Sequence, residues 1–528
     1  MHTQDQSAAI ACLRAALDTG DGEPPRLVET HISLVFIGDS RVMKLKKAVR
    51  LPYLDFGTAE RRLAMCHREM TLNRRTAPDI YRRVHRITAT DAGRAELNGP
   101  GALLDGVVEM ARFDEDGLLD RVAAAGRLDD RLVADLGAVV AGFHTAAAIA
   151  GRDDGAARVR RVLDINHAAL DDAGDLLNDA RRRQVIAATD AAFARLAPLL
   201  DARGRLGRVR HGHGDLHLRN IVLIDGRPVP FDCIEFDDDL ATTDVLYDLG
   251  FLIMDLLHGG FAPQAALLLN RYLDATGGDA AGGDTAGAAS DRGAGLALLP
   301  MLLAMRATIR AHVGATAARD MADADARAAA IAGAAGYLDL AARLLNPPPP
   351  RLVAVGGLSG SGKSTTAAAI AHLVGPAPGA RVISSDRIRK RLCGVAPTTR
   401  LAADAYTPAM SERVYGVMAQ EAAAALAAGH GVIADAVFDR SEARDAVAAV
   451  TAGVGCRFDG IWLQAPEAVL IDRVTARRGD PSDADAAVVR AQIARAAASP
   501  VTGDWHQVAA DTDRATRIEA IRRHLTGT

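Results

Sequence analysis

Short apolar runs bounded by polar or turn-forming residues divide the chain into two regions with different patterns. After the four prolines Pro347–Pro350, runs of strand length alternate with longer stretches of helix formers, which predicts parallel strands joined by helices. These strands are expected at 352–355, 381–385, 431–434 and 460–463. The prolines cannot continue a helix and favour an extended connector, so a linker is expected at 346–350.

The region before the prolines mixes strand and helix patterns. Apolar runs on both sides of Gly38-Asp39-Ser40 predict a hairpin, and Asp225-Gly226 forms the turn of a second strand pair. A helix is expected from Thr58 to Thr76. Other strands are expected at 103–110, 221–224 and 229–231, and helices at 128–200 and 244–257. The prediction is an α+β domain over 1–345, with a flexible insertion at about 276–295, and an α/β domain over 351–528.

Composition narrows the class of protein. A chain of 528 residues exceeds the size of a single core. The net charge of −4, from 62 basic and 66 acidic residues, gives no global footprint for nucleic acid. Five scattered cysteines without a C-x-x-C pair argue against zinc and favour a reducing compartment. The N-terminus does not resemble a signal peptide, and the apolar stretch 296–305 contains Pro300 and is interpreted as a buried helix. We therefore expect a cytoplasmic protein that does not cross a membrane; the oligomeric state is left open.

A glycine-rich motif of the form G-x-x-x-x-G-K-S follows the predicted strand 352–355 and precedes a helix-forming run. This context is typical of a P-loop, in which backbone N–H groups surround the phosphates of a nucleotide. Lys363 would reach the β- and γ-phosphates, and Ser364 would bind Mg²⁺. The predicted nucleotide-binding residues here are Gly357, Leu358, Ser359, Gly360, Ser361, Gly362, Lys363, Ser364 and Thr365.

Further polar residues follow the later strands of the α/β region. Asp386 and Arg389 share one face of the next helix, where Asp386 could accept the proton of a hydroxyl and Arg389 could hold an anion. Asp435 ends the strand 431–434, a position that suits a carboxylate near Mg²⁺. Arg473 and Arg477, with Arg478, are predicted to neutralise the charge of the transferring phosphoryl group from a mobile lid.

A second set of catalytic residue types lies in the α+β region, in the pattern H-x-D-x-x-x-x-N followed by an aspartate at the end of a strand. Asp215 could accept the proton of a substrate hydroxyl. Asn220 and Asp232 supply oxygen ligands of the kind that Mg²⁺ prefers. This pattern meets the needs of phosphoryl transfer from ATP.

On these residues the N-terminal half resembles the aminoglycoside phosphotransferase family, a branch of the protein-kinase-like fold. The resemblance implies that Asp215 is the catalytic base and that Asn220 and Asp232 are the metal ligands. It also implies a phosphate-pairing lysine on the first hairpin; Lys44 is chosen, although Lys46 lies on the same face of the strand. Its helix partner would be Glu69. Glu109 and Met110 would offer backbone groups to adenine.

The C-terminal half resembles small P-loop kinases of the polynucleotide kinase, gluconate kinase and zeta-toxin type, through the P-loop and S-x-D-x-x-R at 384–389. The order of the halves resembles bacterial bifunctional aminoglycoside phosphotransferase/ATP-binding proteins. The resemblance implies two sites for ATP and Mg²⁺, each transferring a phosphoryl group to a hydroxyl, with a small-molecule acceptor expected. Two alternatives stay open: an ATP-dependent regulatory module, and a nucleic-acid 5′-hydroxyl kinase that uses the basic cluster 387–391.

Overall fold

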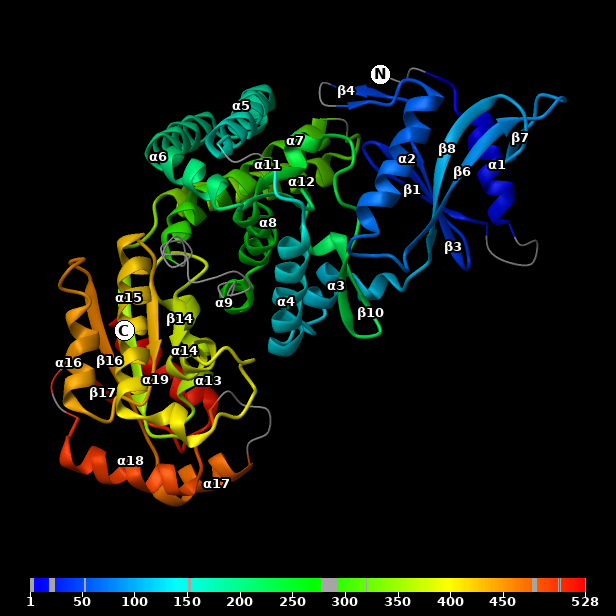
Figure 1. The fold of residues 1–528 in the computed structure, drawn as a ribbon. Helices are drawn as coiled ribbons and strands as arrows, with labels where there is room; N and C mark the ends of the chain where they lie inside the picture. The colour runs from blue at the N-terminus through cyan, green and yellow to red at the C-terminus, as the bar shows by residue number, and fades with distance from the viewer. Residues whose placement is uncertain are drawn as a thin grey trace. The chain divides into compact units, whose positions relative to one another are not determined.

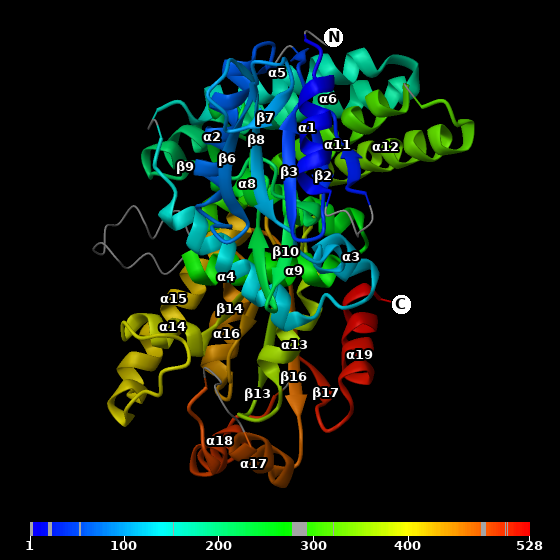
Figure 2. The ribbon, with the colours of Figure 1, turned by 90° about the vertical axis from the view of Figure 1, so that its right-hand side faces the viewer.

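The computed structural model describes residues 4–18, 24–51, 54–150, 153–276, 293–319, 321–476, 482–501, 503 and 505–527. Contacts between residues divide the chain into two units, one of residues 1–150 with 209–248 and one of 151–208 with 249–528 (Figure 1, Figure 2). Helix α8 (Val245–His258) crosses this division. The sequence domains 1–345 and 351–528 differ from these units and stay a prediction. Most of the insertion predicted at 276–295 lies outside the described residues.

An antiparallel sheet of six strands forms the centre of the first unit, in the order β1-β2-β3-β8-β6-β7. Its strands are β1 (Arg26–Glu29), β2 (Ser33–Ile37), β3 (Arg41–Lys46), β6 (Tyr81–Ala89), β7 (Ala95–Leu97) and β8 (Leu103–Ala111). Helix α1 (Ser7–Leu17) packs its apolar side chains on one face, and α2 (Ala59–Asn73) packs on the other (Figure 1). The sheet therefore has two buried faces, and residues alternate between them along β3.

Helix α2 begins where the sequence predicts it. The Oγ1 atom of Thr58, the residue before the helix, accepts a hydrogen bond from the N–H of Arg61 at 3.3 Å, which caps the first turn. The helix ends at Asn73, three residues before the predicted end.

The rest of the first unit consists of short strands and helices around the second predicted hairpin. β10 (Ile221–Ile224) and β11 (Arg227–Pro230) pair antiparallel, and both turn residues, Asp225 and Gly226, have positive φ, as a tight hairpin turn requires. The remaining elements are β4 (Arg50–Leu51), β5 (Leu54–Asp55), α3 (Leu119–Ala124), α4 (Asp130–Ala146), β9 (Val209–His211), α7 (Asp238–Ala241) and β12 (Thr242–Asp244). The α+β class predicted for this region is confirmed.

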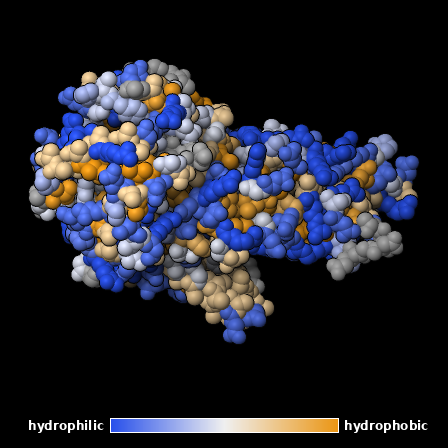
Figure 3. All heavy atoms as spheres, turned by 90° about the horizontal axis from the view of Figure 1, so that it is seen from below, coloured by the Kyte–Doolittle hydropathy of each residue, from blue (hydrophilic) through white to orange (hydrophobic). Residues whose placement is uncertain are grey.

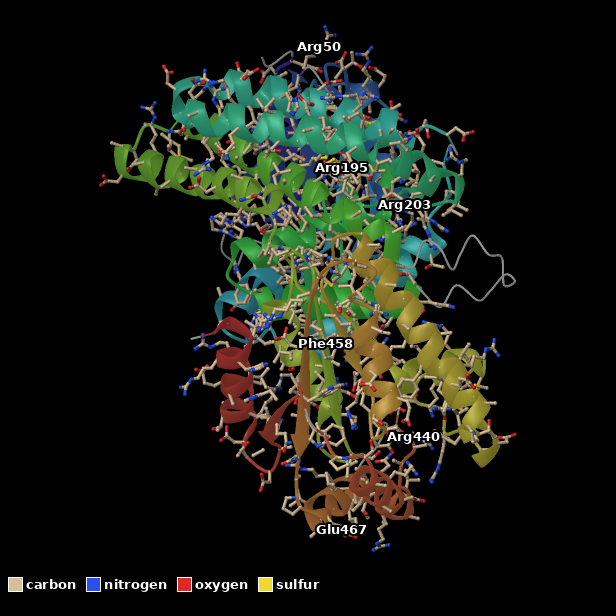
Figure 4. All side chains as sticks on the ribbon, turned by 90° about the vertical axis from the view of Figure 1, so that its left-hand side faces the viewer. Arg50, Arg195, Arg203, Arg440, Phe458 and Glu467 are labelled. Carbon is tan, nitrogen blue, oxygen red and sulfur yellow. The ribbon has the colours of Figure 1, made fainter. Side chains whose placement is uncertain are left out.

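A parallel sheet of five strands forms the C-terminal part of the second unit, in the order β14-β15-β13-β16-β17. Its strands are β13 (Arg351–Gly357), β14 (Arg381–Ser384), β15 (Val432–Asp435), β16 (Arg457–Gln464) and β17 (Trp505–Ala509). Figure 4 marks Phe458 near the start of β16 and Glu467, where the following helix begins beyond the end of the strand. The predicted α/β class is confirmed, and β17 is a strand that the sequence analysis missed.

Helices surround this sheet. The helices are α13 (Lys363–Ile370), α14 (Ser385–Leu392), α15 (Pro408–Ala427), α16 (Ser441–Ala449), α17 (Glu467–Ala476), α18 (Ala486–Ala498) and α19 (Arg514–Thr526). Helices α13 and α19 contribute Ile370 and Ile521 to one buried cluster with Val353 and Val355 of the central strand. Valine and isoleucine dominate this cluster because parallel strands are covered on both faces.

The second unit also contains a group of long helices: α5 (Gly155–Ala173), α6 (Asp179–Arg205), α9 (Ala262–Thr276), α11 (Leu299–Arg319) and α12 (Ala324–Leu345). The helices at 295–319 and 324–345 are long and apolar enough to span a membrane by length and composition. The first of them is mostly buried and packs against α5, α6 and α12, as the sequence analysis expected for 296–305. On the face that Figure 3 shows, apolar and hydrophilic residues are interspersed.

A buried ion pair ties α2 to the sheet of the first unit. The Nε atom of Arg62 donates to Asp105 Oδ1 at 2.7 Å, and both side chains are almost completely buried. Gln6 donates to the other Asp105 oxygen at 2.7 Å. Since removing one partner leaves a buried charge, Arg62→Met should lower the free energy of unfolding of this unit by about 3–5 kcal/mol.

Denaturant titration, with hydrogen exchange of α2 and β8 as the readout for this unit, measures the effect. The matched control is Arg61→Met, because Arg61 is half exposed and its ion pair with Asp55 lies at the surface. The control should cost no more than about 1 kcal/mol. An equal loss of unfolding free energy in the two variants would show that the buried pair stabilises the unit no more than the surface pair does.

Candidate active sites

The first candidate site is organised by one glutamate that two lysines share. Val42, Lys44 and Lys46 lie on the face of β3 that is turned toward α2. Lys44 Nζ donates to Glu69 Oε1 at 2.8 Å, and Lys46 Nζ donates to Glu69 Oε2 at 2.7 Å. Burial alone would raise the pKa of Glu69, but the two ammonium groups lower that pKa to about 2. Glu69 is therefore ionised at neutral pH.

The two lysines differ in their second partners. Lys44 also pairs with Asp232, which follows the end of β11 by two residues. Lys46 is fully buried and pairs with Glu235, three residues further on. Burial works against a charged lysine, yet the neighbouring carboxylates of Asp232 and Glu69 hold the pKa of Lys44 well above its usual value. The five side chains form one network in which Asp232 is the most exposed, with 38% of its side chain accessible to solvent.

The loop 213–220 carries the other predicted residues of this site. The Asn220 amide donates to Asp215 Oδ2 at 2.9 Å and to the Asp215 carbonyl at 3.0 Å. His217 Nε2 lies 3.3 Å from the same carboxylate oxygen. The Phe231 N–H donates to the Asn220 carbonyl at 2.9 Å, so this loop is joined directly to the segment that bears Asp232. The structure thus brings Asp215, Asn220 and Asp232 into one region of the first unit.

A buried aspartate that the sequence analysis did not single out fixes this loop. Asp248 accepts hydrogen bonds from the N–H groups of His213 at 2.7 Å and Gly214 at 2.8 Å. His144 Nε2 lies 3.0 Å from Asp248 Oδ2. Two backbone donors on one carboxylate hold the chain in one conformation immediately before Asp215.

The predicted adenine-binding residues lie inside the sheet. Met110 pairs with Val42 of β3 and with Tyr81 of β6, and the Glu109 carboxylate lies 2.6 Å from His85 Nε2. Their backbone groups are thus flanked by strands on both sides. Beyond the strand, Arg112 donates to the Gly38 carbonyl at 3.1 Å and braces the β2–β3 turn. A cavity of about 580 Å³ opens there, lined by Asp39, Ser40, Arg112, Phe113, Asp114, Glu115, Asp116 and Arg121.

The second candidate site is the glycine-rich loop between β13 and α13. Gly357, Gly360 and Gly362 have φ values of 137°, 90° and 84°, which side-chain-bearing residues rarely adopt. A Cβ on Gly357 would lie 2.6 Å from the Leu463 carbonyl oxygen, and one on Gly360 would lie 2.5 Å from that of Leu470. The loop therefore needs glycine for both conformation and space. Lys363 Nζ donates to the Leu358 carbonyl at 3.1 Å across the loop.

A serine and a buried aspartate meet beside this loop. Ser364 Oγ donates to Asp435 Oδ2 at 2.7 Å, and Asp435 lies opposite Val355 and Ser384 in the parallel sheet. Burial raises the pKa of Asp435, and Lys363 only partly offsets that rise. The hydrogen bonds from Ser364 and Ser384 also lower this pKa, but the effect of burial is larger.

The predicted acceptor-side residues lie on α14, which starts directly after β14. Asp386 is in the first turn and Arg389 lies one turn later on a buried position. Arg389 donates to the Ala405 carbonyl at 2.8 Å and lies over the ring of Tyr406 at 4.8 Å. Its Nε atom has no hydrogen-bond partner among the described residues.

Arginines converge on the other side of the glycine-rich loop. Arg473 donates to the Ala510 carbonyl at 2.9 Å, whereas Arg477 and Arg478 lie outside the described residues. A cavity of about 350 Å³ opens here, lined by Gly360, Gly362, Thr365, Arg473, Thr512, Arg514 and Arg517. Burial, together with the charges of Arg473 and Arg514, lowers the pKa of Arg517. Such a cluster favours an anionic ligand.

A glutamine on α18 forms hydrogen bonds with the glycine-rich loop. Gln492 accepts a hydrogen bond from the Ser359 N–H at 2.8 Å and donates to Ser359 Oγ at 3.1 Å. The sequence analysis missed Gln492, Arg514 and Arg517. Arg514 and Arg517 share a helix face, a signal that the sequence contains but that many solvated helices also show.

Comparison with known proteins defines the class. A model of the phosphotransferase enzyme family matches residues 58–285, and a model of the AAA domain matches residues 352–499. The protein combines a kinase-like phosphotransferase domain with a P-loop kinase-type domain.

The chain is 31% identical over 495 residues to Uncharacterized protein Rv2004c of Mycobacterium tuberculosis, a match that covers 90% of each chain. The chain belongs to the same family as this mycobacterial protein.

Two solved structures are also similar to parts of the chain. A gluconokinase from Sinorhizobium meliloti is 22% identical and covers 34% of this chain and 93% of its own, with a TM-score of 0.24. A choline/ethanolamine kinase family protein from Mesorhizobium loti is 16% identical, and the match covers 64% of this chain and 98% of that protein, with a TM-score of 0.35.

The geometry of the glycine-rich loop, which we call the glycine cradle, predicts the effect of one added methyl group. Gly360→Ala places a Cβ against the Leu470 carbonyl at a positive φ, so the loop must shift away from its conformation. We expect nucleotide affinity at this site to fall about tenfold or more, because the loss of one or two backbone hydrogen bonds to phosphate costs about 1.5–3 kcal/mol each. Gly453→Ala is the control, since a Cβ at Gly453 meets nothing within 4 Å. Titration with a fluorescent ATP analogue checks this, and equal affinity in both variants would contradict it.

Proposed function

We propose that the protein transfers the γ-phosphoryl group of ATP to hydroxyl acceptors at two sites, one in each unit. The observation that carries this proposal is the convergence of Lys44, Glu69 and Asp232 near the Asp215–Asn220 pair in one unit. The glycine cradle with Ser364 bonded to Asp435 supports the same chemistry in the other. Positioning and charge neutralisation are the main requirements of phosphoryl transfer.

At the N-terminal site, the geometry supports a division of roles. Lys44 would move from Asp232 to the phosphates, while Glu69 stays fixed because Lys46 still binds its other oxygen. Asp215 would accept the proton of the acceptor hydroxyl, and its hydrogen bond from Asn220 orients it for this. Arg112 steadies the β2–β3 turn, and the cavity behind it is the place we propose for the nucleoside.

The residues present fit magnesium at this site. Asp232 and Asn220 offer a carboxylate and an amide oxygen, the hard donors that Mg²⁺ takes along with phosphate oxygens and water. In this structure the ammonium group of Lys44 pairs with the Asp232 carboxylate, so a cation already lies at the position proposed for the metal ion. Bound Mg²⁺ would neutralise charge on the phosphates. We propose Asn220 and Asp232 as the protein ligands.

At the C-terminal site, the loop N–H groups and Lys363 would bind the phosphates, and the arginine-lined cavity would receive the rest of the nucleotide. Ser364 and the buried Asp435, which are hydrogen-bonded to each other, fit Mg²⁺ as ligand and supporting carboxylate. Asp386 would accept the proton of the acceptor hydroxyl. Arg389, whose Nε has no hydrogen-bond partner within the described part of the chain, and Arg473 would hold the anionic groups.

The structure favours a small acceptor over a nucleic acid at this site. The basic cluster 387–391 is what favoured a polynucleotide in the sequence. Arg387 lies 3.2 Å from Asp274, and Lys390 lies 2.5 Å from Asp483. Arg391 pairs with Glu421. Because these carboxylates pair with three of the four basic residues of the cluster, we propose a small hydroxylated molecule as acceptor. A regulatory role without transfer stays the alternative, and a phosphorylated product distinguishes the two.

Two single variants separate the sites. Asp215→Asn removes the proposed base and should lower N-terminal transfer about 10²–10⁴-fold while nucleotide still binds. Lys363→Ala should weaken nucleotide binding at the C-terminal site alone. A screen of hydroxylated metabolites with ATP, read by mass spectrometry, assigns each product to one site, with each variant as the control for the other. If neither variant alters product formation or ATP turnover with any acceptor, the proposed function fails.

A second pair of variants should distinguish the roles of the two lysines of β3. Lys44→Met should reduce N-terminal turnover about 10²-fold or more with a small change in melting temperature, because Glu69 keeps Lys46 as partner. Lys46→Met leaves two buried carboxylates short of a partner and should destabilise the unit by about 3–5 kcal/mol. Turnover is measured in the Lys363→Ala background, and stability is measured by thermal unfolding, for each of the two variants. The reverse pattern would make Lys46 the phosphate lysine.

A further inference from the structure

Helix α9 lies within the region matched by the phosphotransferase family, yet it packs against the P-loop sheet of the second unit. Ala266 is completely buried in the same apolar cluster as Val353 and Ile370 of that sheet and its helix α13. The helix is separated from β14 by more than a hundred residues of chain, and it contacts both α13 and β14. A helix from the first family region thus completes the core of the second.

An asparagine on α9 pairs with the backbone of an edge strand. In the described ranges β14 is the outermost strand of the sheet, so one side of its backbone has no neighbouring strand there. Asn270 Oδ1 accepts from the Val382 N–H at 2.8 Å, and Asn270 Nδ2 donates to the Ala380 carbonyl at 2.9 Å. The side-chain amide therefore makes the two hydrogen bonds that a neighbouring strand would make. Asn270 is only 6% exposed, so the pairing is shielded from water.

An aspartate one turn later holds two arginines of the P-loop region. Asp274 Oδ1 lies 2.7 Å from Arg381 Nη1, and Asp274 Oδ2 lies 3.2 Å from Arg387 Nη1. Arg381 also donates to Asn270 Oδ1 at 3.1 Å. Arg381 begins β14, and Arg387 lies in the first turn of α14. One carboxylate thus holds the start of the strand and the start of the helix that follows it.

The residue next to Arg387 is Asp386, the proposed base of the C-terminal site. Because α14 follows β14 without an intervening loop, the position of the strand sets the position of Asp386 and Arg389. We propose that Asn270 and Asp274 are positioning residues for the acceptor side of the C-terminal site, and that α9 is a structural part of that site. This inference rests on the proposed function of the C-terminal site. It also implies that the nucleotide side, built on β13 and α13, depends less on these two residues.

The test uses the full chain in the Asp215→Asn background, so that C-terminal transfer is measured alone. Asp274→Asn and Asn270→Ala should each increase hydrogen exchange in peptides that cover 380–392. They should lower kcat for transfer about tenfold, because small displacements of a catalytic group have large effects on rate. The KM for ATP in this C-terminal transfer should change less than about twofold. Gln264→Ala, on the first turn of the same helix and partly exposed, is the control.

A double-variant cycle separates positioning from general loss of stability. If Asp274 acts through Arg387, then Arg387→Gln should reproduce the loss of kcat, and the double variant should lose little more than either single variant. Unchanged exchange at 380–392, or a rise in the KM for ATP equal to the loss of kcat, overturns the inference. Exchange is measured without an acceptor, so it decides the inference even if no C-terminal transfer is found and the proposed function of that site fails.

Discussion

Burial of carboxylates is the constraint on which both candidate sites depend, since a charge removed from water is stable only with close partners. The two units meet this constraint differently. Glu69 has one lysine on each oxygen and stays ionised well below neutral pH. Asp435 is hydrogen-bonded to the hydroxyls of Ser364 and Ser384, and its burial raises its pKa although Lys363 lowers that pKa in part. In the first unit the paired ammonium groups outweigh the effect of burial on the pKa of Glu69, whereas in the second unit the effect of burial on the pKa of Asp435 prevails.

The parts of the sites that the sequence predicted are local in the chain. The glycines, Lys363 and Ser364 lie within eight consecutive positions, and their order alone indicates the strand, the turn and the helix. Strand alternation likewise placed Lys44 on the face where Glu69 lies. The alternation could not choose between Lys44 and Lys46, because both lie on that face and both bind the same carboxylate. Only their second partners, which come from a distant segment, distinguish them.

The parts that were missed are single polar residues on helices whose partners are distant in sequence. Asp248 binds the backbone 34 and 35 positions away, Asn270 binds it 110 and 112 positions away, and Gln492 binds Ser359 across 133 positions. A lone Asp, Asn or Gln in an apolar helix gives no sign of which backbone it will satisfy. Its burial is the only clue, and burial depends on the fold.

The backbone at Asp232 has a consequence for the variation that this position tolerates. Its φ is 60°, in the left-handed region, and its N–H donates to the Tyr81 hydroxyl at 3.2 Å. Among residues with a side chain, aspartate and asparagine adopt this conformation most readily. Backbone shape and side-chain chemistry therefore select the same two residue types. Substitution of Asp232 by alanine or a branched residue would strain the main chain, whether or not the site is catalytic. An aspartate at this position is therefore weaker evidence of an active kinase than an aspartate at position 215.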